Sequence, residues 1–341
     1  MKQEVNNPCF LCGSTKSLLL FETTYPDLNY PGIFRLDKCD SCGLLFNSPR
    51  LSEDELYKLY GDNYYFFHRR HSDEFQRITN IYRRTIALIE QEVKQKNVVE
   101  IGSAKGYLLA LLKHRGWQVA GIEISAKAAA QAQAKFGVPA FCGTVEQYVE
   151  QNNSGIKFPL VMAIDLFEHI PQPMNFLISI DSILEQDGLL IIDTPNGGSR
   201  NILTLGSEWV GFNPFHIFLY SKENLTQLLA KMGYSIERVF SYNNRRLAAP
   251  NPFPGGAGVA VKSKVKSLLR KAGVLEHSRN AYRKLVGYLR NKNGDIKRHI
   301  AASAQLVEKE PHYLETEDAR GELAGEYGGD NIVVFARKRA Q

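Results

Sequence analysis

Short apolar runs alternate with longer amphipathic stretches from about residue 75 to the end of the chain. The apolar runs are short enough for buried strands, whereas the stretches between them repeat apolar residues at helical spacing. This alternation is typical of a sheet built from βαβ units and predicts a doubly wound α/β domain with a seven-stranded sheet. The predicted strands span residues 97–101, 118–124, 140–142, 159–164, 188–193, 235–242 and 331–337.

Two regions of the chain depart from this pattern. The first 50 residues hold closely spaced cysteines, and nearly ninety residues separate the sixth and seventh predicted strands. A helical insert is therefore expected before the last strand. The predicted organisation is a metal-binding ribbon over 1–50, a helical and aromatic linker over 51–74, a core over 75–245, a basic helical insert over 246–328, and a last strand with a tail over 329–341.

Four of the five cysteines form two Cys-x-x-Cys-Gly knuckles, Cys9/Cys12 and Cys39/Cys42. Each knuckle places two thiolates on one tight turn, and two such turns supply the ligands of a tetrahedral zinc site. The alternative is a pair of disulfides in a secreted domain, but the polar N-terminus lacks the apolar run of a signal peptide. A structural zinc ribbon is therefore predicted, with a hairpin through residues 17–21 and 33–36. The remaining Cys142 is expected to be a small buried residue.

The linker is predicted to begin with a short helix over residues 51–60. Ser52 is expected to cap this helix, with Glu55 completing a capping box. An aromatic run over residues 63–67 follows and is expected to pack the ribbon against the core.

A glycine-bearing turn follows the first core strand in Glu100-Ile-Gly-Ser-Ala-Lys-Gly106. Gly102 and Gly106 allow the backbone to approach a ligand closely before a helix over 107–114 begins. Glu123 ends the second strand, where a carboxylate accepts hydrogen bonds from both hydroxyls of a ribose. The turn and the acid together predict a site for an adenosine-containing ligand.

This turn resembles motif I of the class I S-adenosylmethionine-dependent methyltransferases. Dehydrogenases with a related layout use Gly-x-Gly-x-x-Gly, whereas this chain has Glu-x-Gly-x-x-x-Gly, with Ala104 where many methyltransferases have a middle glycine. Further similarity follows in order through residues 165–171, 184–196 and 216–234. The resemblance covers most of the core and implies a Rossmann-like methyltransferase sheet. A dehydrogenase and a non-catalytic interaction protein that kept the fold are the alternatives.

The resemblance also implies a set of site residues. The turn would line the methionine part of S-adenosylmethionine, Glu123 the ribose, and the segment after the third strand the adenine. An acid that relatives often place near the adenine is missing there. The implied cofactor-binding residues are Glu100, Gly102, Ser103, Ala104, Gly106, Glu123, Ile124, Thr144, Val145 and Asp165.

Two histidines are candidates for the base that removes a proton from the methyl acceptor. His169 follows the fourth strand, at the carboxyl edge where open α/β sheets bind substrates, and His216 lies in an aromatic loop after the fifth. A neutral imidazole is suited to accepting this proton. Glu168 is expected to orient the base.

The ribbon, linker and core together are similar to the zinc-containing sugar methyltransferases, which act on nucleotide-linked deoxysugars, and to relatives associated with surface-polysaccharide synthesis. This resemblance implies a small-molecule or lipid-linked saccharide as acceptor. Those C-methylating enzymes carry a further large α/β domain after the core that this chain lacks, so O-methylation and C-methylation both stay open. A zinc-ribbon RNA methyltransferase is the runner-up, although the segment after the fourth strand lacks the Pro-Pro-aromatic run of base N-methylators.

The insert concentrates positive charge in a chain of 341 residues with a net charge of +6. Residues 260–300 contain twelve Lys or Arg and two acids, with apolar residues at helical spacing. A solvated helical lid is the favoured interpretation, with an anionic membrane surface and nucleic acid as alternatives. The expected location is the cytoplasm. Peripheral contact with the inner face of the membrane is the alternative.

Overall fold

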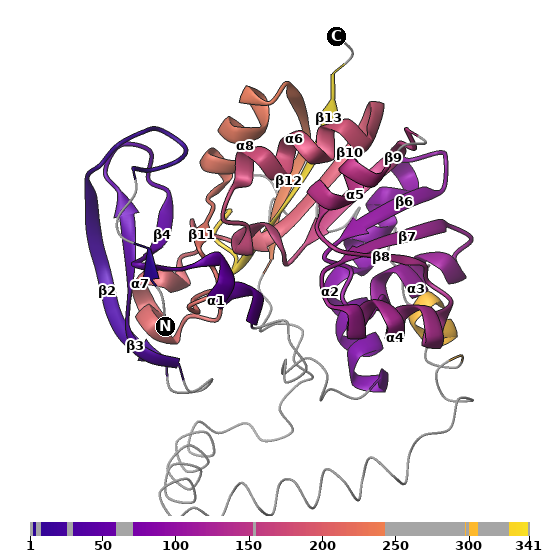
Figure 1. Cartoon of the computed structure of the whole chain (residues 1–341), viewed down its shortest axis with the longest axis horizontal. Helices are drawn as coiled ribbons and strands as arrows, with labels where there is room; N and C mark the ends of the chain where they lie inside the picture. The colour runs from indigo at the N-terminus through magenta and orange to yellow at the C-terminus, as the bar shows by residue number, and fades with distance from the viewer. Residues whose placement is uncertain are drawn as a thin grey trace, which may run out of the picture.

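A seven-stranded sheet forms the centre of the protein (Figure 1). The structure is a computed structural model that describes residues 3–4, 8–25, 30–58, 71–152, 155–242, 297, 300–305 and 327–339. The strand order is β12-β13-β10-β9-β6-β7-β8, and β13 runs in the opposite direction to the other strands of this sheet. The strands are β6 (Asn97–Ile101), β7 (Gln118–Glu123), β8 (Ala140–Cys142), β9 (Phe158–Ile164), β10 (Leu184–Pro195), β12 (Tyr234–Tyr242) and β13 (Asn331–Lys338). The predicted α/β fold and its seven strands are confirmed.

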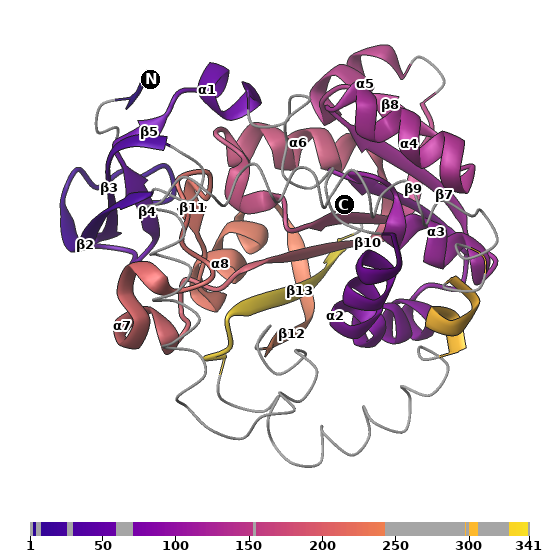
Figure 2. The ribbon, with the colours of Figure 1, turned by 90° about the horizontal axis from the view of Figure 1, so that it is seen from below.

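Helices cover both faces of this sheet, with α2 and α6 on opposite sides (Figure 2). Successive strand residues point to opposite faces, so Val98 packs with α2 and α3, while Val99 packs with α6 and α8. Strands buried on both faces explain the continuous apolar runs of the sequence. The helices are α2 (His71–Glu92), α3 (Tyr107–His114), α4 (Ala126–Phe136), α5 (Val145–Gln151), α6 (Pro173–Ile183), α7 (Asn201–Leu205) and α8 (Lys222–Lys231), with short 3₁₀ turns at Phe167–His169 and Gly206–Glu208.

The N-terminal ribbon is joined to the core by a shared sheet. Strands β2 (Ser17–Tyr25) and β3 (Tyr30–Cys39) form the predicted hairpin in a longer version, and β4 (Leu45–Ser48) pairs with β3. The core segment β11 (Phe218–Leu219) adds a fourth strand beside β4. The Phe10 and Phe218 rings lie 4.6 Å apart between their centroids. The ribbon and the loop before β11 therefore form one packed unit (Figure 1).

The predicted capping box in the linker is wrong. Helix α1 (Glu53–Lys58) follows β5 (Arg50–Leu51), which pairs with β1 (Gln3–Glu4). The Ser52 hydroxyl is buried and has no hydrogen-bond partner among the described residues, and the Glu55 carboxylate pairs with Lys58 at 2.9 Å. The acids of the first turn favour this helix end electrostatically.

The expectation that Cys142 is buried is also wrong. Its side chain is exposed, because β8 is the edge strand of the sheet and Cys142 is the last residue of β8. A short apolar run on an edge strand resembles a core strand in sequence, although fewer neighbours cover it.

Most of the basic insert and the aromatic run over residues 63–67 lie outside the described residues, as do the contacts expected of them. The described residues 300–305 are helical, and the carbonyl of Ala304 accepts a hydrogen bond from Arg115 at 3.1 Å. This described part of the insert thus packs against the α3 side of the core. No helix in the described part of the chain is long and apolar enough to cross a membrane.

Candidate active site

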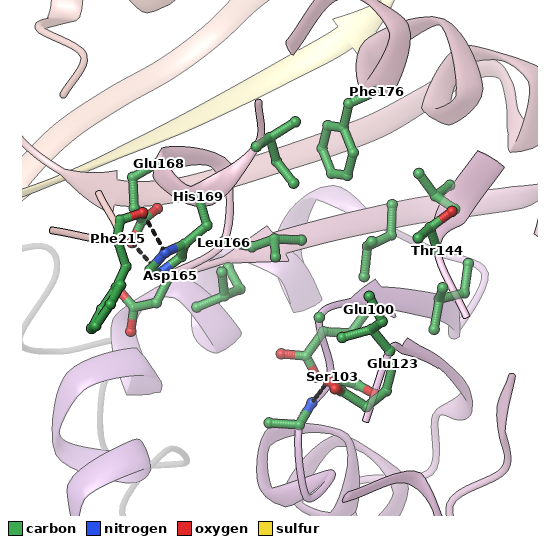
Figure 3. A pocket seen from close by; sticks show the side chains of 18 of the residues that line it. Glu100, Ser103, Glu123, Thr144, Asp165, Leu166, Glu168, His169, Phe176 and Phe215 are labelled. Atoms are coloured by element: carbon green, nitrogen blue, oxygen red, sulfur yellow. Dashed lines mark hydrogen bonds and ion pairs between the residues drawn. The ribbon is translucent and has the colours of Figure 1, made fainter. Parts of the chain in front are cut away.

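A cavity of about 860 Å³ opens at the carboxyl ends of β6, β7 and β9. Figure 3 shows acidic and hydroxyl side chains of the β6 and β7 ends on one side and the residues after β9 on the other. Among the residues predicted from sequence, the cavity is lined by Glu100, Gly102, Ser103, Ala104, Glu123, Ile124, Thr144, Val145, Asp165, Glu168, His169 and His216. Gly106 does not line it.

The turn after β6 adopts left-handed backbone angles at three alternate residues. The φ angles are 72° at Gly102, 48° at Ala104 and 72° at Gly106. A Cβ atom on Gly106 would lie 2.9 Å from the Cβ of Ala132, so this glycine allows α3 to pack close to α4. Its role in the structure is helix packing, while Gly102 to Ala104 present their backbone to the cavity.

Glu123 is held rigidly at the floor of the cavity. Its carboxylate accepts hydrogen bonds from the backbone N–H groups of Ala104 at 2.7 Å and Ser125 at 2.8 Å. Burial raises the pKa of Glu123, while these two amides lower it. Each carboxylate oxygen keeps a further lone pair, so the group remains able to accept hydrogen bonds from a ligand.

Two buried polar atoms beside Glu123 lack partners. Oε2 of Glu100 and Oγ of Ser103 have no hydrogen-bond partner among the described residues. Burial, followed by the charges of Glu123 and Asp165, raises the pKa of Glu100 well above its usual range. Unsatisfied buried groups are costly, so this end of the cavity suits a polar, cationic ligand such as S-adenosylmethionine.

Three side chains meet at the opposite end of the cavity. Glu168 and His169 lie on the 3₁₀ turn after β9, and His216 lies in the loop before β11. Oε1 of Glu168 is 3.8 Å from Nε2 of each histidine, and the two imidazole centroids are 4.7 Å apart. The tertiary structure thus brings together the catalytic candidates from two separate sequence segments.

Both imidazoles are neutral in this environment. Burial lowers the pKa of His169 to about 4, and burial together with the charge of His169 lowers that of His216 well below its usual value. Nδ1 of His169 lies 2.9 Å from the carbonyl oxygen of Phe215, and Nδ1 of His216 lies 2.7 Å from that of Gly211. Because a carbonyl oxygen can only accept a hydrogen bond, each Nδ1 carries the ring hydrogen and each Nε2 carries a lone pair.

Glu168 is the most enclosed member of this cluster. Burial and the charge of Asp165 raise the pKa of Glu168 well above its usual range. The hydroxyl of Thr194 donates a hydrogen bond to its Oε2 at 2.9 Å. The carboxyl group is therefore oriented from the sheet, with its Oε1 side toward the two imidazoles.

Asp165 is positioned by side chains that the sequence did not single out. It has a left-handed φ of 47°, and its carboxylate accepts hydrogen bonds from the Tyr82 hydroxyl at 2.5 Å and the Asn331 amide at 3.3 Å. Tyr82 comes from α2 and Asn331 from β13, and both line the cavity. No motif marks these residues, because only the packing of distant elements brings them to Asp165.

The four knuckle cysteines form a compact cluster without a disulfide. The sulfurs of Cys9 and Cys42 are 3.6 Å apart and those of Cys12 and Cys39 are 3.5 Å apart, within a cluster no wider than 4.8 Å. Thiolates bound at about 2.3 Å to a tetrahedral zinc ion are separated by about 3.8 Å. Burial raises the pKa of Cys39, but the N–H groups of Cys42 and Ser41 outweigh it and lower the pKa to about 7. The cluster therefore fits a zinc site.

Residues 49–239, more than half of the chain, match the family model of a methyltransferase domain. The chain belongs to this methyltransferase family. It is 30% identical over 124 residues to a ubiquinone biosynthesis O-methyltransferase of Glaesserella parasuis, covering 34% of this chain and 52% of that enzyme. The enzyme of the same name from Chromobacterium violaceum is 26% identical over 172 residues, covering 44% of this chain and 73% of the relative. The chain thus spans about half the length of the Glaesserella relative.

Two solved methyltransferase structures are also similar to this chain, at low identity. An S-adenosylmethionine-dependent methyltransferase from Archaeoglobus fulgidus has a TM-score of 0.45 and 16% identity, covering 76% of this chain and 93% of that one. The plantazolicin methyltransferase BpumL, solved with S-adenosylhomocysteine, has a TM-score of 0.46 and 11% identity, covering 84% and 94%. The family model thus identifies residues 49–239 as a methyltransferase domain.

Proposed function

We propose that this methyltransferase transfers the methyl group of S-adenosylmethionine to a hydroxyl oxygen of a saccharide or nucleotide-linked sugar. The observation that carries the proposal is the division of the cavity. One end offers the strained turn and the buried acids Glu100 and Glu123, and the other offers two neutral imidazoles. A sulfonium donor and a hydroxyl acceptor need these two environments side by side.

At the donor end, each group is assigned one part of the cofactor. Gly102, Ser103 and Ala104 would contact the methionine part, and Glu123 would accept hydrogen bonds from the ribose hydroxyls. Glu100 would contribute negative charge near the cationic donor, since ionisation of this buried acid becomes favourable only beside a cation.

The adenine would lie farther along the same end of the cavity. Thr144 and Val145 would lie at its edge, where Thr144 caps α5 and is held by a capping box with Gln147. Asp165 would stand at the mouth between the two ends, held by Tyr82.

At the acceptor end, the protein must remove the hydroxyl proton. The donor supplies an activated methyl carbon, whose bond to sulfur breaks as the acceptor oxygen bonds to it. Nε2 of His169 or His216 would take the hydroxyl proton, because Nδ1 of each ring is hydrogen-bonded to a backbone carbonyl. In His216 this Nε2 would first have to release the Asn213 amide, which lies 2.8 Å away. Glu168 would help to hold the imidazoles in place by packing beside them, with its Oε1 3.8 Å from each Nε2.

The saccharide assignment is supported by exposed side chains that line the cavity. Gln172 and Asn175 offer amides for sugar hydroxyls, and Tyr57, which is 45% exposed, offers aromatic surface for a sugar ring. A phenolic acceptor is the second candidate. It is supported by the ubiquinone biosynthesis O-methyltransferases among the relatives and by the aromatic side chains of the same cavity.

The deciding experiment is transfer of a tritiated methyl group from S-adenosylmethionine to a panel of acceptors. The panel contains nucleotide sugars, lipid-linked saccharides, catechols and other phenols, and total RNA. Label in a saccharide supports the proposal, whereas label confined to phenols favours the second candidate. Label confined to RNA would contradict both.

The same assay tests the catalytic assignment. His169→Ala should lower kcat by about 100-fold or more, as expected for loss of general-base catalysis. His114→Ala is the matched control, because His114 is exposed at the end of α3, away from the cavity. Equal loss of activity in both variants would contradict the assignment.

We also propose that Cys9, Cys12, Cys39 and Cys42 bind one structural Zn²⁺. The support is the distance between their sulfur atoms, which is close to the separation of about 3.8 Å between two thiolates bound to one tetrahedral zinc ion. The ion would hold the two knuckles together and with them the ribbon, since the binding of structural zinc is coupled to folding.

A further inference from the structure

The cluster of Glu168, His169 and His216 has the dimensions of a second metal site. Their ligand atoms all lie within 4.8 Å of one another. Oε1 of Glu168 is 3.8 Å from Nε2 of each histidine, which is too long for a hydrogen bond. Two ligands bound at about 2.1 Å to one ion are separated by about 3.0 to 4.2 Å, depending on the angle at the metal. The two distances from Glu168 fall in this range.

The orientation of the two imidazoles supports the same conclusion. The carbonyls of Phe215 and Gly211 fix the hydrogens on Nδ1, so each Nε2 carries a lone pair and lies 3.8 Å from Oε1 of Glu168. A histidine that binds a metal commonly donates its other N–H to a carbonyl or carboxylate in this way. Three electron-pair donors thus lie within 4.8 Å of one another at the wall of the cavity, where a cation would stabilise them.

We propose that Glu168, His169 and His216 bind a divalent cation at the acceptor end of the cavity. Two imidazoles and one carboxylate favour ions of intermediate softness such as Mn²⁺, Co²⁺ or Zn²⁺. Three protein ligands leave coordination positions open, and the cavity gives an acceptor oxygen access to them. The ion would lower the pKa of a hydroxyl bound to it. With the ion bound, both Nε2 atoms would be ligands, and the ion would replace the imidazole as the group that favours loss of the hydroxyl proton.

Only this last role of the ion rests on the proposed function. The binding of the cation itself depends on the three side chains alone. A measurement on the protein without donor and acceptor therefore separates the failure of one proposal from the failure of the other.

Asn213 competes with the cation for His216. The Oδ1 atom of Asn213 accepts hydrogen bonds from the N–H groups of Phe215 at 2.9 Å and His216 at 3.1 Å, which turns its amide nitrogen toward Nε2 of His216 at 2.8 Å. A bound cation would displace this amide. Asn213→Asp keeps the acceptor for the two N–H groups and replaces the competing amide with a carboxylate oxygen, so it should tighten binding.

The test is a titration of the zinc-loaded full chain with Mn²⁺. Binding is measured as the loss of the electron paramagnetic resonance signal of free Mn²⁺. Mn²⁺ prefers oxygen and nitrogen ligands and leaves zinc in a four-thiolate site. We expect one Mn²⁺ per chain, binding at least about tenfold weaker in Glu168→Gln, and tighter binding in Asn213→Asp. His114→Ala should bind as the unmodified chain does.

The proposal is overturned if the unmodified chain binds no Mn²⁺, or if Glu168→Gln binds it equally well. Circular dichroism and binding of S-adenosylhomocysteine check that each variant is folded. If Glu168→Gln does not fold, the comparison of Asn213→Asp with the unmodified chain still decides. Unchanged or weaker affinity in folded Asn213→Asp would then contradict the site.

Discussion

The side-chain amide of Asn47, in the ribbon, donates a hydrogen bond to the backbone carbonyl of His216, in the core, at 2.9 Å. The same amide nitrogen donates to the carbonyl of Asn213 at 2.8 Å, and the backbone N–H of Asn47 donates to Ile217 at 3.0 Å. Asn47 is buried, and the loop it holds carries one of the two catalytic candidates. The ribbon is thus a structural support for the active-site loop.

Asn47→Ala should therefore lower activity without removing the ribbon. Loss of the two side-chain hydrogen bonds leaves buried carbonyls unsatisfied and frees the His216 loop, at a cost of about 1 to 3 kcal/mol. We expect kcat to fall by about tenfold or more, with little change in the Kd of S-adenosylhomocysteine. Thr23→Ala, on strand β2 of the same ribbon, is the control. An equal effect of both substitutions on kcat would show that the loop does not depend on Asn47.

Removal of one knuckle thiolate should release the zinc ion. Cys39→Ser is expected to purify without zinc and to lose the ordered ribbon sheet, because the ion and the fold of the ribbon are coupled. Elemental analysis of the freshly purified protein measures the metal, and limited proteolysis reports on the ribbon. Cys142→Ser is the matched control, because Cys142 is exposed on β8 outside the cluster. Zinc retained in full by Cys39→Ser would contradict the assignment.

Substitution of Glu123 should weaken cofactor binding. Glu123→Ala removes the acceptor for the ribose and also the partner of the Ala104 and Ser125 amides, so the Kd of S-adenosylmethionine should rise at least about tenfold. Isothermal titration calorimetry measures this change. Glu150→Ala, an exposed position on α5, should leave the Kd unchanged. An unaltered Kd in Glu123→Ala would rule out the ribose assignment.

The buried carboxyl group of Glu100 should make the protein less stable as pH rises. Below about pH 4.5 the group is protonated in both folded and unfolded chains. Above that pH the unfolded chain releases the proton while the folded chain keeps it, so the free energy of unfolding falls up to the raised pKa. Each pH unit of this window costs up to about 1.4 kcal/mol.

Glu100→Gln cannot ionise, so it should gain stability relative to the unmodified chain as pH rises. Urea unfolding without cofactor at pH 5 and pH 8 measures the difference. The exposed Glu150→Gln should show no such dependence on pH. If the stability difference between Glu100→Gln and the unmodified chain is the same at both pH values, the carboxyl group is not held neutral.

Local sequence patterns predicted the elements of the sheet closely. The strand β6 and the helix α3 have the predicted bounds, because a run of buried apolar residues and a glycine turn are properties of neighbouring residues. The same holds for the knuckles, whose thiolates are positioned by tight turns within a few residues.

The site was predictable only where a motif marked it. Glu123 and the turn at Gly102 line the cavity as the resemblance implied, and so do His169 and His216. The sequence contained no signal for Tyr82, Asn331 or Asn47, although all three hold site residues in place.

The physical reason lies in the range of the interactions. Hydrophobic period, turn chemistry and metal-ligand spacing act over a few residues, so the sequence by itself determined the order of the elements, the donor-side turn and the four-cysteine cluster. Two other features depend on how distant elements pack. One is the pairing of the ribbon with the core strand β11, and the other is the cluster of Glu168, His169 and His216. Only the tertiary structure decided them, because side chains far apart in the sequence share one environment only after the sheet has formed.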